Sequence, residues 1–176
     1  MTRIEIPTLR SARLVLRAFS ADDLPHLHAM ALDAEVTRHL GKDGGTDGPP
    51  PTLEAVWQRL ATALGQWGLR GYGMFAVEDA KGFVGRAGLH HPFGEPAPQL
   101  SYILCRRSWG HGYATEAAAA ARGWMLETHR PGCLVSHIAP ENAASARVAA
   151  KLGAIRDGSA GQAGFLLDIW HHRLTG

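Results

Sequence analysis

Hydrophobic and polar positions change their spacing several times along this chain. Leu14 and Leu16 would point to one face of a strand, and Arg13, Val15 and Arg17 to the other. This alternation predicts a strand over residues 12–18. After Ser20, a candidate helix cap, apolar residues recur at helical spacing as far as Leu32. The chain is therefore expected to begin with a strand followed by a helix.

The later segments continue this mixture of strands and helices. In chain order, the patterns predict a short helical piece from Asp33, a loop over 41–51, a helix from Thr52 to about Gly68, strands over 73–78, 83–89 and 99–105, a helix over 114–127, a strand over 133–139, a helix over 143–152 and a final strand over 164–174. The turn at 79–82 favours a hairpin. Antiparallel strands followed by strand–helix alternation predict one α/β domain over residues 1–176, a mixed sheet with helices on its faces.

Composition excludes several classes of protein. The apolar fraction is 45%, the charged fraction 19% and the formal net charge +2, so neither nucleic acid nor an anionic membrane is indicated as a partner. The N-terminal segment is charged throughout and the apolar stretches are too short to span a bilayer, so we expect no signal peptide and a cytoplasmic location. Cys105 and Cys133, without a CxxC motif or a Cys/His cluster, predict reduced thiols in strands and no metal site.

The stretch over 99–121 holds the strongest chemical signal. A strand is followed by a short loop with two glycines and then by a helix. The first N–H groups of a helix have no partner within it, and the helix dipole is positive there. Because Gly110 and Gly112 carry no side chain, an anionic oxygen can approach these amides, and Arg106 and Arg107 flank them. The segment therefore predicts an anion cradle, with a simple tight turn as the structural alternative.

A second polar segment follows the strand over 133–139. Asn142 stands at the start of the next helix, where it can cap that helix or hydrogen-bond a ligand lying between two strand ends. Ser145 is three residues further on, about one helical turn, so both side chains can face the same cleft. For Ser145, helix packing is the structural alternative to a ligand contact.

Three motifs in this order resemble the GCN5-related N-acetyltransferases. Residues 107–112, RSWGHG, fit the R/Q-x-x-G-x-G/A signature of that family. The runs WGHGYATEA at 109–117, PENAASARVAAKLGA at 140–154 and LRSARLVLRAFSADDL at 9–24 are similar to the branch that contains the ribosomal-protein N-terminal acetyltransferases. The resemblance covers nearly the whole chain.

The resemblance implies a specific fold, donor and acceptor. The fold would be a central mixed, mostly antiparallel twisted sheet of about seven strands, flanked by about four helices, with a cofactor cleft between two splayed strands. Acetyl-CoA would be the acetyl donor, and a primary amine, either a protein N-terminal α-amine or a small-molecule amine, would be the acceptor. The diphosphate would lie on the amides of 107–115, the pantetheine arm would pair with Ile103 and Leu104, and an N–H there would stabilise the developing oxyanion.

The site residues implied in this way fall into two groups. The cofactor-binding group is Ile103, Leu104, Arg106, Arg107, Gly110, His111, Gly112, Tyr113, Ala114, Thr115 and Asn142. The catalytic candidates are Asn142 and Ser145, near the thioester.

Two positions depart from the pattern of the family. Many relatives carry a Glu where Gln99 stands, and an amide cannot act as a general base. The Tyr that often serves as general acid would fall at Ala149, which leaves Ser145 to protonate the departing thiolate. The candidate proton acceptors are His90, His91, Glu95 and His111, each with an exposed loop position as the alternative. An α-amine has a pKa of about 8, against about 10.4 for lysine, so more of it is neutral and it suits a site without a strong base better.

Two other functions stay open at this stage. The departures at Gln99 and Ala149 favour a non-catalytic or regulatory CoA-binding module with the same fold. An unrelated nucleotide-binding domain is the other alternative, although the chain lacks a Walker loop and has Thr115 in place of the third glycine of GxGxxG. We expect acceptor specificity in the loops over 41–51 and 91–98, and an exposed strand edge near the C-terminus would allow a homodimer.

Overall fold

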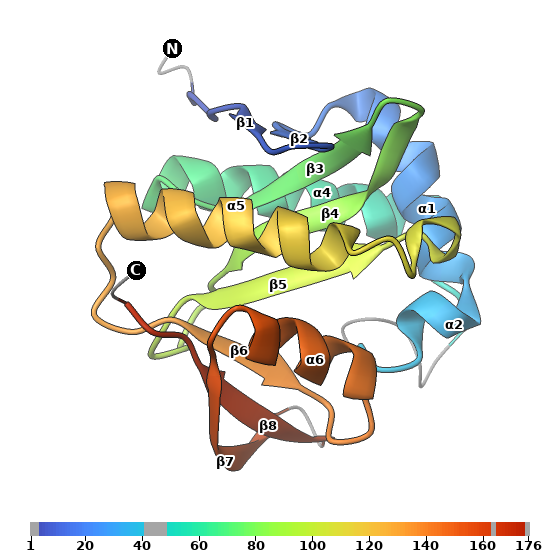
Figure 1. Ribbon diagram of the computed structural model, residues 1–176. Helices are drawn as coiled ribbons and strands as arrows, with labels where there is room; N and C mark the ends of the chain where they lie inside the picture. Colours follow the sequence, from blue (N-terminus) through green and yellow to red (C-terminus); the bar gives the residue numbers. More distant parts are fainter. Residues whose placement is uncertain (1–3, 41–48, 163–164, 175–176) are drawn as a thin grey trace.

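Eight strands form one open sheet in the computed structural model, which describes residues 4–40, 49–162 and 165–174. Their order in the sheet is β1-β2-β3-β4-β5-β6-β8-β7 (Figure 1). Neighbours are antiparallel throughout, except that β5 and β6 run parallel. The strands are β1 (Leu9–Arg10), β2 (Val15–Arg17), β3 (Met74–Asp79), β4 (Gly82–His90), β5 (Gln99–Leu104), β6 (Val135–Ile138), β7 (Ile155–Gln162) and β8 (Phe165–His171).

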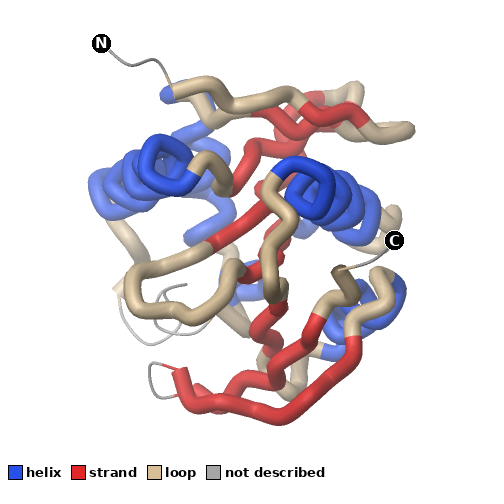
Figure 2. The backbone as a smooth tube through the Cα atoms, turned by 90° about the vertical axis from the view of Figure 1, so that its left-hand side faces the viewer, coloured by secondary structure: helices blue, strands red, loops and turns tan. Residues whose placement is uncertain are grey.

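Helices cover both sides of this sheet (Figure 2). Helix α5 packs against β4 and β5, and α1 packs against α4 over the other face. In the described residues the α-helices are α1 (Leu24–Leu32), α2 (Ala34–Thr37), α4 (Leu53–Arg70), α5 (Tyr113–Thr128) and α6 (Ala143–Lys151). The predicted fold class, a mixed and mostly antiparallel sheet between helices, is confirmed.

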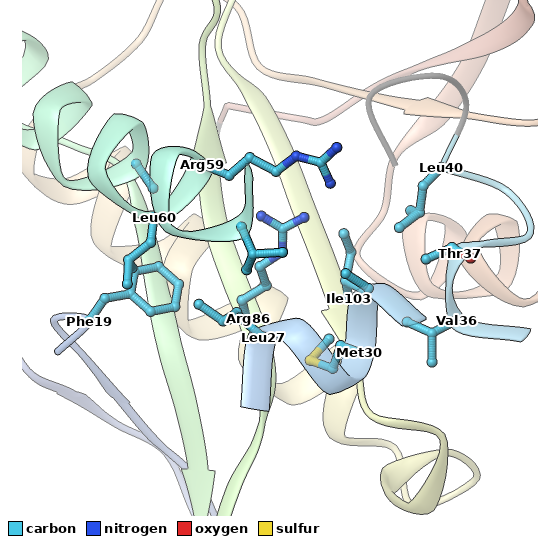
Figure 3. A pocket seen from close by; sticks show the side chains of 13 residues that line it. Phe19, Leu27, Met30, Val36, Thr37, Leu40, Arg59, Leu60, Arg86 and Ile103 are labelled. Carbon is cyan, nitrogen blue, oxygen red and sulfur yellow. The ribbon is translucent and has the colours of Figure 1, made fainter. Parts of the chain in front are cut away.

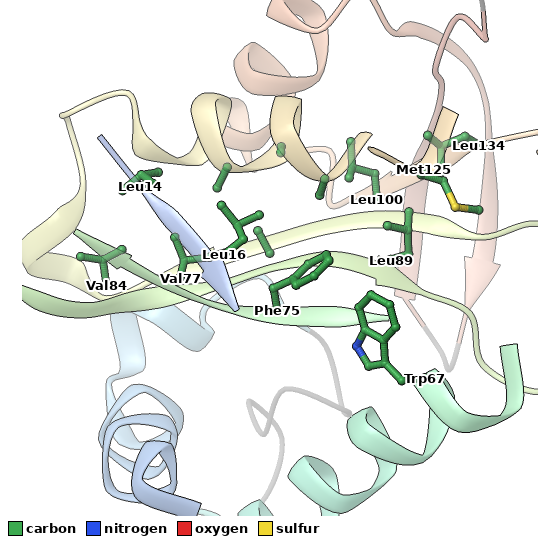
Figure 4. Close-up of a cluster of buried hydrophobic side chains, with 14 residues drawn as sticks. Leu14, Leu16, Trp67, Phe75, Val77, Val84, Leu89, Leu100, Met125 and Leu134 are labelled. Atoms are coloured by element: carbon green, nitrogen blue, oxygen red, sulfur yellow. The ribbon is translucent and has the colours of Figure 1, made fainter. Parts of the chain in front are cut away.

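The larger core cluster lies between the sheet and α5 (Figure 4). Phe75, Leu16 and Leu89 from the strands are fully buried there. Helix α5 contributes small side chains, including Ala117 and Ala121, whose exposed fraction is 0%. Because these alanines add little height, the helix lies close to the sheet and its N-terminus is fixed relative to β5.

A second cluster fills the opposite face, under α1 and α4. Met30 and Leu60 from the helices pack there against Met74 and Phe83 from the strands. Ile103 of β5 belongs to this cluster, so alternate residues of β5 face the two different helix layers. Side chains of β5 therefore contact both helix layers.

The hairpin predicted from the turn at 79–82 is confirmed, and β3 pairs with β4. Within β4, Gly85 has φ +152°, and a Cβ atom there would lie 2.4 Å from the carbonyl oxygen of Ile103. No side chain fits at that distance, so glycine allows β4 to approach β5 closely beside the site described below.

Three elements differ from the sequence prediction. Strand β1 and strand β7 were not predicted. The final strand expected over 164–174 is β8, and the unpredicted β7 precedes it and pairs with it as a hairpin. Helix α4 continues past Gly68 to Arg70 and ends at Gly71, whose φ of +74° is left-handed. It continues because Trp67 is buried and donates from Nε1 to the carbonyl of Met74 at 3.0 Å, so packing outweighs the low helix propensity of glycine.

Residues 41–48 of the loop predicted over 41–51 lie outside the described residues. Cys105 and Cys133 are unpaired thiols, each partly exposed just outside a strand rather than within one. Burial raises the pKa of the Cys105 thiol above its ordinary value. Among the described helices, none combines the length and the apolar character needed to cross a membrane.

Candidate functional site

Strands β5 and β6 meet at one end and then diverge. Their pairing consists of the single pair Gln99↔Val135. Just beyond it, the hydroxyl of Ser136 donates to the carbonyl of Leu100 at 2.7 Å. Towards Leu104, the edge of β5 that faces β6 has no paired strand in the described part of the chain (Figure 1). Main-chain donors and acceptors in the middle of the sheet are thereby left available to another partner.

Residues 105–112, called the glycine loop below, connect β5 to the start of α5. Gly110 and Gly112 have φ of +79° and +77°, a left-handed conformation that favours glycine. A Cβ at Gly110 would meet nothing within 4 Å, so the loop is open on that side. Gly112 is the N-cap residue of α5 and provides no side-chain cap, whereas Asn142 caps α6. The first N–H groups of α5 therefore lack a capping side chain, and the helix dipole adds positive potential.

Arg13 reaches this loop from the N-terminal hairpin. Its Nη1 donates to the carbonyl of His111 at 2.9 Å, and its guanidinium carbon lies 4.8 Å from the ring centre of Tyr113. Glu116 accepts from the Arg13 backbone at 2.7 Å and from Ser11 Oγ at 2.7 Å. Burial tends to raise the pKa of Glu116, but these hydrogen bonds outweigh it and hold the pKa below its usual value. The Arg13 guanidinium is also ion-paired with Glu116, with Nη2 2.6 Å from Oε2, so Arg13 fixes the loop to the N-terminal hairpin rather than adding an unpaired cation. Sequence reasoning missed this residue because nothing in its local pattern connects it to residue 111.

Arg106, Arg107 and Trp109, which follow β5, contact three different parts of the molecule. Arg107 donates through Nη2 to the carbonyl of Phe83, and Arg106 Nε lies 3.8 Å from Asp33 Oδ2. Trp109 donates from Nε1 to the carbonyl of Leu104 at 2.9 Å, which fixes the loop against the end of β5. Both arginines are exposed beside the loop amides, and their guanidiniums are directed to Phe83 of β4 and to Asp33 before α2.

Helix α6 follows β6 and begins on the β6 side of the point where β5 and β6 separate. Asn142 Oδ1 accepts from the backbone N–H of Ser145 at 3.0 Å, the capping geometry considered for this residue. Tyr102 of β5 donates from its hydroxyl to the carbonyl of Ser145 at 3.0 Å. Burial raises the pKa of Tyr102, so its hydroxyl stays protonated. The carbonyl of Ser145 thus contacts β5 through Tyr102, and the side-chain oxygen of Asn142 is engaged as the cap of α6.

The candidate proton acceptors lie at two different ends of the site. His91 is engaged on both ring nitrogens, by the Tyr72 hydroxyl at 2.6 Å and by the carbonyl of Glu95 at 3.0 Å. His90 pairs with Gln99, so both lie where β5 begins. His111 lies in the glycine loop with its ring centre 5.6 Å from that of Tyr113. None of these contacts assigns a role in proton transfer.

The two departures from the family pattern occupy buried positions. Gln99 is 8% exposed, and its Nε2 has no hydrogen-bond partner among the described residues. Ala149 is fully buried and packs with Ile138 and Ala154 between α6 and β6. A buried amide nitrogen without a partner is costly, and this one lies at the point where β5 and β6 separate.

An apolar pocket with two arginines opens on the α4 side of β5 (Figure 3). Its cavity volume is about 50 Å³, and Ile103 lines it together with Arg59 of α4 and Arg86 of β4. Burial lowers the pKa of Arg86 to about 10, and the charge of Arg59 acts in the same direction. Arg86 was not singled out from the sequence, although a charged residue inside the apolar run Phe83–Leu89 was the available signal.

The glycine loop, the uncapped helix and the diverging strands occur together in a known family. A family model described as an acetyltransferase (GNAT) domain matches residues 13–155. The chain belongs to this family. The resemblance seen in the sequence is confirmed.

Individual proteins are similar to this chain in sequence or in fold. The uncharacterized protein YkkB of Bacillus subtilis (strain 168) is 34% identical over 90 residues, which are 48% of this chain and 52% of that protein, so the match spans about half of the curated relative. The crystal structure of the acetyltransferase from Agrobacterium tumefaciens str. C58 has a TM-score of 0.83 at 28% identity and covers 98% of both chains. RimL, a ribosomal L7/L12 alpha-N-protein acetyltransferase in complex with coenzyme A, shares the fold, with a TM-score of 0.77 at 20% identity over 94% of this chain and 96% of that one.

Proposed function

We propose that this GNAT protein is an acetyl-CoA-dependent N-acetyltransferase that acts on a primary amine, either a protein N-terminal α-amine or a small-molecule amine. The observation that carries the proposal is the divergence of β5 and β6 beside the uncapped start of α5. This combination offers main-chain groups for an amide-containing arm and N–H groups for a diphosphate at one end of it.

The residues present fit acetyl-CoA. Gly110 leaves the loop amides open, and Arg13, which is ion-paired with Glu116, holds the loop through the carbonyl of His111. In β5 the main chain of Ile103 faces β4, whereas that of Leu104 faces the unpaired edge. The carbonyl of Leu104 accepts from Trp109, so its N–H is the group that would hold the arm of the ligand. Acetyl-CoA supplies an acetyl group activated as a thioester. An N–H of β5 that points into the divergence would stabilise negative charge on the acetyl oxygen.

Transfer of the acetyl group also requires two proton movements. A C–N bond forms and the C–S bond breaks, while one proton leaves the acceptor nitrogen and one reaches the departing sulfur. Ser145 is the proposed donor to the sulfur, because it lies at the start of α6 next to Tyr102. The α-amine of a protein or peptide loses its proton more readily than a lysine side chain, which favours it in a site without a strong base.

Titration calorimetry with acetyl-CoA, followed by free-thiol release with mixed amine acceptors, tests the proposal. We expect binding followed by amine-dependent release of thiol. Ser145→Ala should bind acetyl-CoA like the wild type but release thiol roughly 100- to 10,000-fold more slowly, because proton transfer by a positioned side chain contributes about that much. Alanine is a good helix former, so the stability of α6 should be kept.

A matched variant separates the capping role of Asn142 from a contact with the ligand. Asn142→Asp keeps the oxygen that accepts from the Ser145 N–H but loses the amide donor. Reduced activity with unchanged melting temperature would assign Asn142 to the reaction, and unchanged activity would leave it as a helix cap. Absence of acetyl-CoA binding in the wild-type protein would refute the proposed function.

A non-catalytic CoA-binding module is the second candidate. Gln99 and Ala149 favour it, since neither side chain can transfer a proton. Binding of acetyl-CoA without thiol release for any amine in the panel would support this candidate over the enzyme.

A further inference from the structure

Two arginines share the pocket beside Ile103, and neither has an acidic partner among the residues that the structure describes. Figure 3 shows Arg59 and Arg86 with their guanidiniums turned toward the same space. Within the described ranges, neither guanidinium has a hydrogen bond or an ion pair to the protein. Arg17 shows the contrast, since its Nη2 lies 2.8 Å from Asp23 and 2.5 Å from Glu78.

The position of Arg86 makes its charge unfavourable in the free protein. It extends from the middle of β4, and burial together with the nearby Arg59 lowers its pKa to about 10, so it is still cationic at neutral pH. A partly buried cation beside a like charge is stabilised when an anion pairs with it. The planar guanidinium is the side chain best suited to hold a carboxylate through two parallel hydrogen bonds.

The pocket lies next to the proposed point of acetyl transfer. Arg86 is the cross-strand partner of Ile103, so their Cβ atoms are roughly 5 Å apart on one face of the sheet. The rest of the lining is mainly apolar and includes Phe19, Leu27, Met30 and Leu60. The volume of about 50 Å³ exceeds the ~10–15 Å³ that one water needs, so there is room for the end of a ligand.

We propose that Arg86 and Arg59 bind the anionic group of the acceptor, so that the preferred acceptor is a primary amine carrying a carboxylate on a short apolar framework. This inference rests on the proposed acetyltransferase function. The carboxylate can belong to a small amino acid or to an acidic residue near the N-terminus of a peptide, and both present the same chemistry to the two arginines.

Two matched probe pairs test the proposal. 4-(Aminomethyl)benzoate and 4-(aminomethyl)benzamide differ only in charge, and the peptides Ala-Glu-Leu-Leu-amide and Ala-Gln-Leu-Leu-amide differ in the same way. In at least one pair the acid should have a kcat/KM about tenfold or more above that of its amide. Preference within the first pair indicates a small-molecule acceptor, and preference within the peptide pair alone indicates an N-terminus. Equal rates within both pairs would overturn the proposal.

Variants assign any preference to the two arginines. Arg59→Gln, at an exposed position, and Arg86→Met should each bring the acid-to-amide ratio close to one. Arg70→Gln, on the exposed end of the same helix α4, should leave the ratio unchanged. Arg86→Met should melt no lower than the wild type, because it removes a partly buried charge that lies beside the like charge of Arg59. A ratio that survives in Arg59→Gln and in Arg86→Met overturns the assignment.

Direct binding keeps this test separate from that of the proposed function. Calorimetry on the protein saturated with CoA compares the same acids and amides without turnover. Tighter binding of the acid by about tenfold or more, lost in Arg59→Gln, supports the anion site even if no thiol is released. Equal affinities for acid and amide refute the anion site, whatever the result with acetyl-CoA.

Discussion

His172 is a buried histidine that links the last strand to the start of β5. Its Nε2 lies 2.9 Å from the hydroxyl of Ser136, which itself donates to the carbonyl of Leu100. The hydroxyl has a single hydrogen, so the bonding network assigns the ring proton to Nε2. The ring's Nδ1 is buried and has no partner among the described residues. Burial, with additional repulsion from Arg122 and His171, lowers the pKa of His172 to about 4.

This lowered pKa predicts a loss of stability in mild acid. Between about pH 6.5 and 4 the unfolded chain takes up a proton at His172 and the folded protein does not, so the free energy of unfolding falls as the pH falls. The loss is as much as roughly 3 kcal/mol. Urea unfolding at about pH 7 and about pH 4.5 measures it. The difference between the two pH values should shrink in His172→Gln and persist in His171→Gln, which changes an exposed neighbour. Equal differences in all three proteins would contradict this assignment.

At the scale of the elements, the start of α5 offers a test with a matched control. Gly110 and Gly158 have φ of +79° and +86°, and a Cβ at either position meets nothing within 4 Å. Alanine at either site should therefore cost a similar ~1–2 kcal/mol of unfolding free energy. Only Gly110→Ala places a methyl group on the open face of the loop, so only this variant should weaken acetyl-CoA binding in calorimetry. Equal affinities in the two variants would count against the loop as the diphosphate site.

The elements differ in how far the sequence could predict them. The hairpin of β3 and β4 and helix α5 carry strong local patterns, and both were predicted nearly to the residue. Strand β7 has little β propensity, since its sequence is IRDGSAGQ. It is held by pairing with β8 and by Asp168, whose Oδ1 accepts from Arg156 at 2.7 Å and from Ser159 at 2.8 Å. Such a strand is specified by its partner rather than by its own residues, so a local pattern could not find it.

The residues of the candidate site also differ in how far the sequence could predict them. Gly110, Gly112, Asn142 and Ser145 belong to contiguous motifs, and the sequence indicated them. Arg13 and Arg86 act through neighbours that are distant along the chain, at His111 and across the sheet at Ile103. The register of β4 with β5 had to be known before Arg86 could be placed beside β5.

At the scale of the whole molecule, the sheet consists of two parts that meet at Gln99 and Val135. Strands β1 to β5 form one part, and β6, β8 and β7 form the other. The hydroxyls of Tyr102 and Ser136 bridge the two parts. Packing across the boundary includes Leu134, which belongs to the same buried cluster as the residues of α5.

A ligand held between the two parts should stabilise the entire fold. At about one hundred times its Kd, CoA would add ~2.7 kcal/mol to the free energy of unfolding, which raises Tm by roughly 5–10 °C for a domain of this size. Thermal melting with CoA, and with ATP or NAD at the same concentration, measures this shift. Hydrogen exchange should slow in β5, in β6 and in the first turn of α5. Greater protection by ATP or NAD than by CoA would favour a nucleotide-binding domain instead.

The unpaired side of β5 resembles the outer edge of a sheet, yet it lies in the middle of the molecule. An edge of this kind accepts any partner that presents amide groups at strand spacing, since main-chain hydrogen bonds do not distinguish side chains. In the proposed arrangement, selection among thioester donors therefore falls to the two ends of the ligand. A donor shortened to its pantetheine arm would still fit beside β5, and it would lose affinity mainly through the missing phosphates.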